Sequence, residues 1–221
     1  MPAFAGKKKI KTMKLAFIGI GNVGFAIANN LQQKGYEIVV ANDNPDSKSV
    51  QKALAENSNF EVSPVQEAIK ASEVVFLATP FNSNQAILEG LDFQGKTLID
   101  CTNPVGAGIS HGLKSEISGS EKIQEWASTS QVVKAFTIYG FENFSNPEAF
   151  NSEVKPVMLF AGNDTEAKAQ AKAIINDTGF FAKDVGGLDQ ALHLEHMTLL
   201  WVKMARRDGH HPNFTWAYLE K

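Results

Sequence analysis

The stretch Leu15–Ala28 reads LAFIGIGNVGFAIA, an apolar run followed by Gly19, Gly21 and Gly24. The run is typical of a buried strand, and the segment after the glycines is typical of a helix. In the spacing G-x-G-x-x-G, Gly19 permits a tight turn, Gly21 lets a pyrophosphate approach the backbone, and Gly24 lets the helix pack closely on the strand. The stretch therefore predicts the start of a dinucleotide-binding fold.

The turn also predicts where the phosphates lie. We expect them beside the backbone amides of Ile20, Asn22 and Val23, because N–H groups and the helix dipole favour an anion at a helix N-terminus. A glycine-rich turn without a ligand is the alternative. The strand, turn and helix in succession favour binding.

Outward from this stretch, short β-rich runs alternate with longer helical patterns. The predicted strands are residues 14–19, 37–42, 74–79, 96–101, 130–136, 156–162 and 180–185. The predicted helices cover about residues 22–34, 46–56, 64–71, 82–89, 141–150 and 164–176. Such alternation predicts an α/β fold of the Rossmann type, with a doubly wound, mainly parallel sheet.

Two later regions complete the organisation. Residues 103–130 are rich in Gly and Ser without a clear period, which predicts a long loop where the strand order reverses and ligands bind. Apolar residues at helical spacing from Leu188 predict a C-terminal amphipathic helix. We therefore expect a flexible basic tail at 1–12, a dinucleotide-binding domain at 13–187, and a C-terminal helix with an aromatic tail at 188–221.

That C-terminal segment also predicts a homodimer. The run LLWVKM at 199–204 and the aromatic residues Phe214, Trp216 and Tyr218 present more apolar surface than a lone helix easily buries. The alternative is that the tail folds back over the sheet.

Composition narrows the functional classes. The chain has 221 residues, 43% of them hydrophobic, which suits one large domain. A net charge of −3 gives no attraction to nucleic acid, and no apolar run approaches the ~18 residues of a membrane span. The single cysteine, Cys101, cannot form an intramolecular disulfide, so we expect a cytoplasmic protein with no nucleic-acid or membrane partner.

The second predicted strand ends in a carboxylate at the spacing expected for a ribose contact. Asp43 follows Gly24 by nineteen residues, and Asn42 precedes it. A carboxylate accepts hydrogen bonds from ribose hydroxyls and repels a ribose phosphate, so we expect NAD rather than NADP. Asp43 could equally be a turn or capping residue, and Lys48 nearby could still gather a phosphate.

Two further strand ends carry small polar residues beside proline. These are Thr79-Pro80 and Thr102-Asn103-Pro104. At the carboxyl ends of neighbouring strands they could follow the dinucleotide toward its nicotinamide, and we count them as candidate cofactor contacts. They could also be ordinary turns.

Several segments together resemble a known family. They are FIGIGNVG (17–24), VVFLATP (74–80), LIDCTNP (98–104), VVKAFTIYGFENFSNP (132–147), VMLFAGND (157–164) and DVGGLDQALHLEHMTLLW (184–201). The chain from Met13 to about Arg206 resembles the small NAD(P)-binding oxidoreductases related to the deazaflavin (coenzyme F420)-dependent NADP reductase. It is also similar to the cytosolic reductase domain of six-transmembrane metalloreductases.

The resemblance implies hydride transfer between NAD(P)(H) and a flavin or deazaflavin, a small-molecule redox acceptor stacked beside the nicotinamide. Such chemistry needs little from side chains, because both partners are cofactors. The segment Val133–Phe136 is the most specific element, and it adds Ala135 to the candidate cofactor contacts. The deazaflavin reductases typically present Ser-Arg where this chain has Asn42-Asp43, so their NADP preference does not carry over.

Other functions stay open at this point. A small-substrate dehydrogenase could use Lys134 to polarise a carbonyl, which makes Lys134 the one weak catalytic candidate. A dinucleotide sensor would bind and transfer nothing. His193 and His196 share a helix face with Glu195 between them, but two histidines do not complete a metal site, so we predict none.

Overall fold

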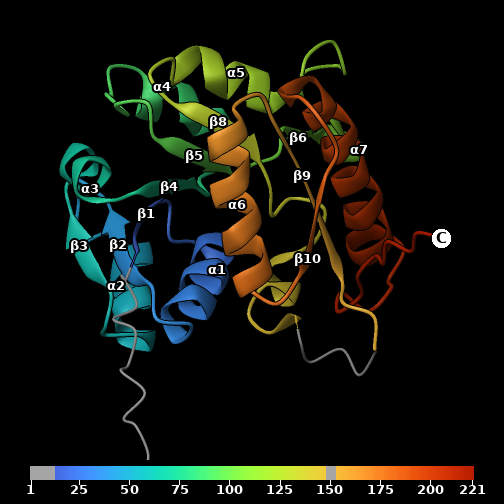
Figure 1. Cartoon of the computed structure of the whole chain (residues 1–221), viewed down its shortest axis with the longest axis horizontal. Coiled ribbons are helices and arrows are strands. Elements are labelled where there is room, and N and C mark those ends of the chain that lie inside the picture. Colours follow the sequence, from blue (N-terminus) through green and yellow to red (C-terminus); the bar gives the residue numbers. More distant parts are fainter. Residues whose placement is uncertain (1–12, 148–152) are drawn as a thin grey trace, which may run out of the picture.

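The apolar run before the glycines forms the strand β1 of a twisted sheet. In the computed structural model, which describes residues 13–147 and 153–221, this sheet has eight strands with helices on both faces (Figure 1). The order is β10-β9-β8-β5-β4-β1-β2-β3, and all neighbours are parallel except β8 and β9. The strands are β1 (Lys14–Ile18), β2 (Glu37–Ala41), β3 (Glu61–Ser63), β4 (Val74–Leu77), β5 (Thr97–Asp100), β8 (Gln131–Lys134), β9 (Val157–Gly162) and β10 (Phe181–Asp184).

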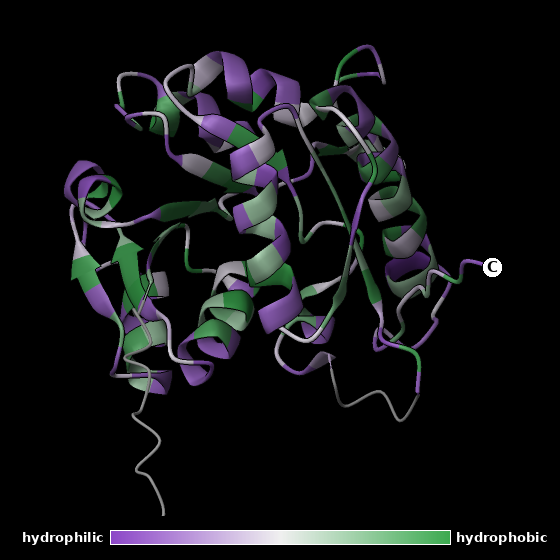
Figure 2. Ribbon diagram, viewed as in Figure 1, coloured by the Kyte–Doolittle hydropathy of each residue, from purple (hydrophilic) through white to green (hydrophobic). Residues whose placement is uncertain are grey.

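Two apolar layers hold the helices on the sheet, because alternate residues of each strand point to opposite faces. Leu15 and Phe17 pack under one set of helices, and Ala16 and Ile18 pack under the other. Figure 2 shows the apolar residues of the central strands. The first layer receives α1 (Asn22–Gln33), α2 (Lys48–Glu56) and α6 (Thr165–Asp177), and the second receives α3 (Val65–Ala71), α4 (Asn84–Leu88) and α5 (Gly119–Trp126). The predicted doubly wound, mainly parallel α/β fold is thus confirmed.

The position of the strand-order reversal differs from the prediction. Strands β1 to β3 are added in one direction and β4, β5 and β8 in the other, so the order reverses at the connection from β3 to β4. The segment 103–130 instead joins two neighbours, β5 and β8. The crevice of the fold therefore lies above β1 and β4, beside the glycine turn.

The same segment is not one long loop. It contains a hairpin of β6 (Val105–Gly106) and β7 (Ser110–His111), and then helix α5. The helix begins with a capping box in which Ser118 and Glu121 each accept a hydrogen bond from the backbone of the other. The spacing of Ser118 and Glu121 is a helix signal in the sequence, and the prediction of a loop over 103–130 overlooks it.

The C-terminal helix α7 (Ala191–Val202) ends in a π-helical turn at Lys203–Arg207. Its polar residues are not confined to the exposed side, because Glu195 and Thr198 lie on the buried face, and in this the helix departs from the predicted amphipathic pattern. Trp201 is buried, whereas Leu200 is 48% exposed.

The aromatic tail folds back on the chain. The ring of Trp201 stacks on Phe214, with centroids 5.6 Å apart. Trp216 accepts a hydrogen bond from the amide of Val157 (2.9 Å) and donates its own to the hydroxyl of Tyr139 (3.1 Å). The tail residues that suggested a dimer therefore have partners within the chain.

Two predicted features fall wholly or partly outside the described residues. The basic tail at 1–12 lies outside them, as does the end of the helix predicted at 141–150. Phe141–Asn143 forms a single 3₁₀ turn. In the part of the chain described, the helices are too short or too polar to cross a bilayer.

Candidate functional site

The three glycines of the turn differ in what surrounds them. Gly19 has φ +96°, and a Cβ there would lie 2.7 Å from the carbonyl carbon of Ala78. A Cβ on Gly24 would lie 2.2 Å from the oxygen of Gly19. At Gly21, by contrast, no atom of the described chain lies within 4 Å of that position. Packing within the protein explains Gly19 and Gly24, whereas the space beside Gly21 is open.

The N-terminus of α1 is open to an anion. Gly21 is its N-cap residue, and no side chain caps the helix. Gly21 and Asn22 are exposed. The first-turn amides therefore face solvent without a side-chain acceptor, as an anion site at a helix N-terminus requires.

A cavity of about 620 Å³ lies beside this turn, above the carboxyl ends of β1, β2 and β4. That volume suits a nucleotide-sized ligand. The candidate residues that line the cavity are Gly19, Ile20, Gly21, Asn42, Asp43, Thr79 and Pro80.

A second cavity, of about 490 Å³, shares Ile20, Gly21 and Ser49 with the first. It extends between α1 and α2 and adds Lys48 and Lys52 to the lining. Asn22, a predicted phosphate contact, also lines it. The two cavities meet at the glycine turn.

Six of the candidate cofactor contacts line neither cavity: Val23, Gly24, Thr102, Asn103, Pro104 and Ala135. Ala135 is fully buried, and its amide donates to the carbonyl of Asp100 (3.1 Å). Thr102 is buried as part of a polar network described below. Asn103 is half-buried, and its Oδ1 lacks a hydrogen-bond partner among the described residues.

Asp43 caps a helix that is distant in the sequence, and it also lies at the cavity wall. Its Oδ1 accepts a hydrogen bond from the amide of Val65 (2.9 Å), at the start of α3. The residue is exposed and lines the larger cavity. The capping bond holds the carboxylate at the cavity wall.

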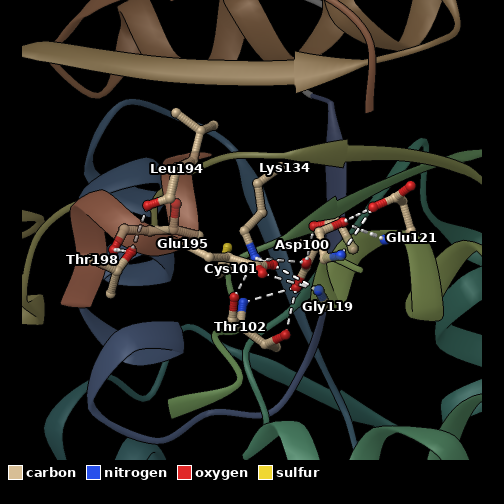
Figure 3. Close-up of polar contacts among 12 residues, drawn as sticks. Asp100, Cys101, Thr102, Gly119, Glu121, Lys134, Leu194, Glu195 and Thr198 are labelled. Carbon is tan, nitrogen blue, oxygen red and sulfur yellow. Dashed lines mark hydrogen bonds and ion pairs between the residues drawn. The ribbon is translucent and has the colours of Figure 1, made fainter. Parts of the chain in front are cut away.

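A buried ion network lies at the carboxyl ends of β5 and β8 (Figure 3). Lys134 Nζ contacts Asp100 Oδ2 (3.1 Å), Glu195 Oε1 (3.0 Å) and the carbonyl oxygen of Thr102 (2.5 Å). The Lys134 and Asp100 side chains are 0% exposed. Of these residues, the sequence analysis predicts only Lys134 and Thr102. A single acidic residue in an apolar strand or helix gives no sequence signal that identifies its ion-pair partner.

The charges in this network support one another. Burial alone would lower the pKa of Lys134, but Asp100 and Glu195 outweigh it and hold that pKa above its ordinary value. Burial alone would raise the pKa of Glu195, but Lys134, His111 and the amide of Gly119 together hold it below its ordinary value. Lys134 and Glu195 are therefore a charged pair inside the protein.

Histidine 111 completes the network with a defined tautomer. Its Nδ1 faces the amides of Leu113 (3.3 Å) and Ser115 (3.1 Å), which can only donate. Its Nε2 therefore carries the proton and donates to Glu195 Oε2 at 2.8 Å. No group of three side chains that could hold a metal ion occurs among the described residues.

The geometry leaves Lys134 no free donor. An ammonium group has three N–H bonds, and three acceptors surround this one. Lys134 links β8 to β5 and α7, and it has no N–H for a substrate carbonyl.

The sheet order and the glycine turn are those of a Rossmann-type α/β fold. The model of the family "NADP oxidoreductase coenzyme F420-dependent" matches residues 14–104. This match confirms, for that part of the chain, the relationship predicted from the sequence.

Curated relatives share a similar segment. The NADP(+) ketol-acid reductoisomerase of Psychrobacter sp. (strain PRwf-1) is 38% identical over 80 residues, which are 36% of this chain and 23% of that protein. The corresponding enzyme of Psychrobacter arcticus is 38% identical over 71 residues, 32% of this chain and 20% of that protein. The chain spans less than a quarter of the length of these relatives.

Solved structures share the fold over most of the chain. A candidate F420-dependent NADP reductase from Arthrobacter sp. FB24 has a TM-score of 0.77 and 21% identity, covering 94% of this chain and all of that one. A reductive aminase from Aspergillus terreus, in complex with NADPH and ethyl levulinate, has a TM-score of 0.63 and 19% identity, covering 88% of this chain and 61% of that one. At these identities the likeness shows the fold.

Proposed function

We propose that this chain is an NAD(P)-dependent oxidoreductase that transfers a hydride between the dinucleotide and a flavin or deazaflavin acceptor. The observation that carries the proposal is Gly21, whose missing side chain leaves space that no other part of the described protein uses. The description of the matching family, which includes coenzyme F420, supports the acceptor class.

The residues of the chain bind and orient the dinucleotide. The amides at the start of α1 would hold the pyrophosphate, and Asn42 and Asp43 would face the adenosine ribose. Thr79 and Pro80 would follow the molecule toward its nicotinamide. The bound nicotinamide supplies the hydride, and the protein holds the two rings in register.

The test is consumption of reduced nicotinamide cofactor, followed by its absorbance, with flavins and with deazaflavin as acceptors. Turnover with a carbonyl compound instead would favour the dehydrogenase. Tight dinucleotide binding without turnover with any of these would favour the sensor.

We further propose that the carboxylate of Asp43 favours NAD over NADP. Support comes from its capping bond to Val65, which keeps the carboxylate at the wall where a ribose phosphate would lie. Lys48 and Lys52, in the adjoining cavity, are the groups that would oppose this preference. The named curated relatives use NADP(+).

Asp43→Asn is expected to strengthen NADP binding relative to NAD by about tenfold, since an unfavourable charge is removed near a phosphate. Asn keeps an oxygen that can accept from the Val65 amide, so the cap survives. Asp46→Asn, in the same loop but in neither cavity lining, is the control. Calorimetric titration with both dinucleotides measures the ratio. Tighter binding of NADP than NAD by the unmodified protein would overturn the preference.

We also propose a homodimer in which the exposed Leu200 of α7 is part of the contact. Sedimentation of the unmodified protein tests it, and a monomer would contradict it.

Deleting residues 208–221 is expected to lower the free energy of unfolding by about 2–4 kcal/mol, because partly buried Phe214 and Trp216 leave the core cluster. Denaturant unfolding measures this loss. Leu219→Ala, at a side chain that is 78% exposed, is the control and should change stability by less than about 0.5 kcal/mol. An equal effect of both changes would show that the tail does not stabilise the fold.

A further inference from the structure

Thr79 is fixed at two points at the edge of the larger cavity. Its methyl carbon Cγ2 lies 2.8 Å from where a Cβ of Gly19 would be, so the methyl packs closely on that glycine. Its hydroxyl oxygen lies 2.5 Å from Oδ1 of Asn84, which is 0% exposed. Thr79 therefore faces the cavity with its side-chain rotation set.

A chain of hydrogen bonds continues behind it to the buried ion network. Asn84 Nδ2 lies 3.3 Å from Thr102 Oγ1, and Thr102 Oγ1 lies 2.7 Å from Asp100 Oδ1. Asp100 is the partner of the Lys134 ammonium at 3.1 Å. The chain thus runs from a buried charge to a residue of the cavity wall.

The ion network sets the direction of every bond in this chain. A carboxylate only accepts, so Thr102 must donate its single hydrogen to Asp100. Thr102 can then only accept from Asn84, which places the amide NH₂ of Asn84 toward Thr102. The Asn84 oxygen consequently faces Thr79, and Thr79 donates its hydrogen inward.

Thr79 is left with lone pairs and no hydrogen for a ligand. Phosphate oxygens are acceptors and gain nothing from such a group, whereas a sugar hydroxyl can donate to it. In the sheet, β2 is followed by Asp43, its neighbour β1 leads to the glycine turn, and β4, which precedes Thr79, comes next. A dinucleotide laid along this order brings its second ribose to Thr79.

We propose that Thr79 Oγ1 accepts a hydrogen bond from a hydroxyl of the nicotinamide-side ribose, and that Asn84 is the positioning residue that fixes Thr79 as an acceptor. The inference rests on the proposed dinucleotide function. Asn84 is 0% exposed and does not line the cavity, but it determines whether the Thr79 hydroxyl donates or accepts a hydrogen bond there.

The test compares three probes: the oxidised dinucleotide that the unmodified protein binds more tightly, ADP-ribose, and ADP, which ends at the pyrophosphate. Thr79→Val is expected to weaken the dinucleotide and ADP-ribose about tenfold, as for the loss of one hydrogen bond, and to change ADP less than about twofold. Thr79→Ser keeps the hydroxyl and should stay within about threefold for all three. Unchanged ADP-ribose affinity in Thr79→Val, or an equal loss for ADP, overturns the ribose assignment.

The role of Asn84 is tested by a double-mutant cycle. Asn84→Ala should weaken dinucleotide binding in the unmodified protein and have little further effect in Thr79→Val, because it acts through Thr79. Additive losses overturn the positioning role. Circular dichroism verifies that each variant folds. Gly21→Val separates the proposed dinucleotide site from the proposed role of Thr79. Unchanged affinity of Gly21→Val for all three probes would contradict the dinucleotide site itself, whereas a negative result for the Thr79 variants alone would contradict only the ribose assignment.

Discussion

Replacing Lys134 by Met is expected to lower the free energy of unfolding by about 3–5 kcal/mol. The substitution keeps most of the side-chain volume but removes the ammonium that Asp100 and Glu195 share. Two carboxylates would then remain inside the protein without their cation. Because a buried uncompensated charge costs more than the lost pair itself contributed, the effect should far exceed that of an ordinary lysine.

The chain offers a matched control in Lys14. It too lies in a strand and pairs with two carboxylates, Glu61 at 2.9 Å and Glu37 at 3.7 Å. Its side chain is 25% exposed, so Lys14→Met should cost at most about 1 kcal/mol. Denaturant unfolding of both variants measures the contrast. Similar losses for the two lysines would show that burial does not set the strength of the network.

Gly21→Val is expected to weaken dinucleotide binding by at least about 100-fold while the fold stays intact. The backbone of Gly21, with φ −70° and ψ −161°, is in an extended region open to any residue. A Cβ there lies more than 4 Å from the described atoms beyond its chain neighbours, so the added side chain should extend into the space of the ligand. Titration with the dinucleotide, beside thermal unfolding, separates the two effects.

Gly24→Ala is the complementary control. Its Cβ would lie 2.2 Å from the Gly19 oxygen, so this smaller substitution should destabilise the protein itself. Unchanged dinucleotide affinity in Gly21→Val would remove the glycine turn from the binding site.

The parts of the fold visible in the sequence are those with strong local patterns. All seven predicted strands exist, and five of the predicted helices begin and end within two residues of α1, α2, α3, α4 and α6. Strand β3 was missed because its three residues, Glu61–Ser63, carry almost no apolar pattern. Helix α5 was missed because the glycines and serines around it outweighed the capping signal at Ser118.

In the candidate site, too, the features with a local sequence pattern could be predicted and those formed by distant residues could not. The glycine turn is local, so its residues and their roles could be predicted together. The ion network joins positions 100, 111, 134 and 195, and only the sheet register, which pairs Asp100 with Lys134, brings the first charges together. The sequence around Asn84 contains no pattern that predicts its hydrogen bonds to Thr79 and Thr102.

The ion network also bears on whether a fragment of this chain could fold without the rest. The segment shared with the NADP oxidoreductase family ends at residue 104, just after Asp100. The cation that neutralises Asp100 comes from β8, and the second acid comes from α7. A chain cut after residue 104 would keep the whole glycine turn and yet expose an orphan carboxylate together with the unpaired edge of β5. We therefore expect residues 14–104 of this protein not to fold on their own, because the partners of Asp100 and the neighbouring strand of β5 lie in the C-terminal part of the chain.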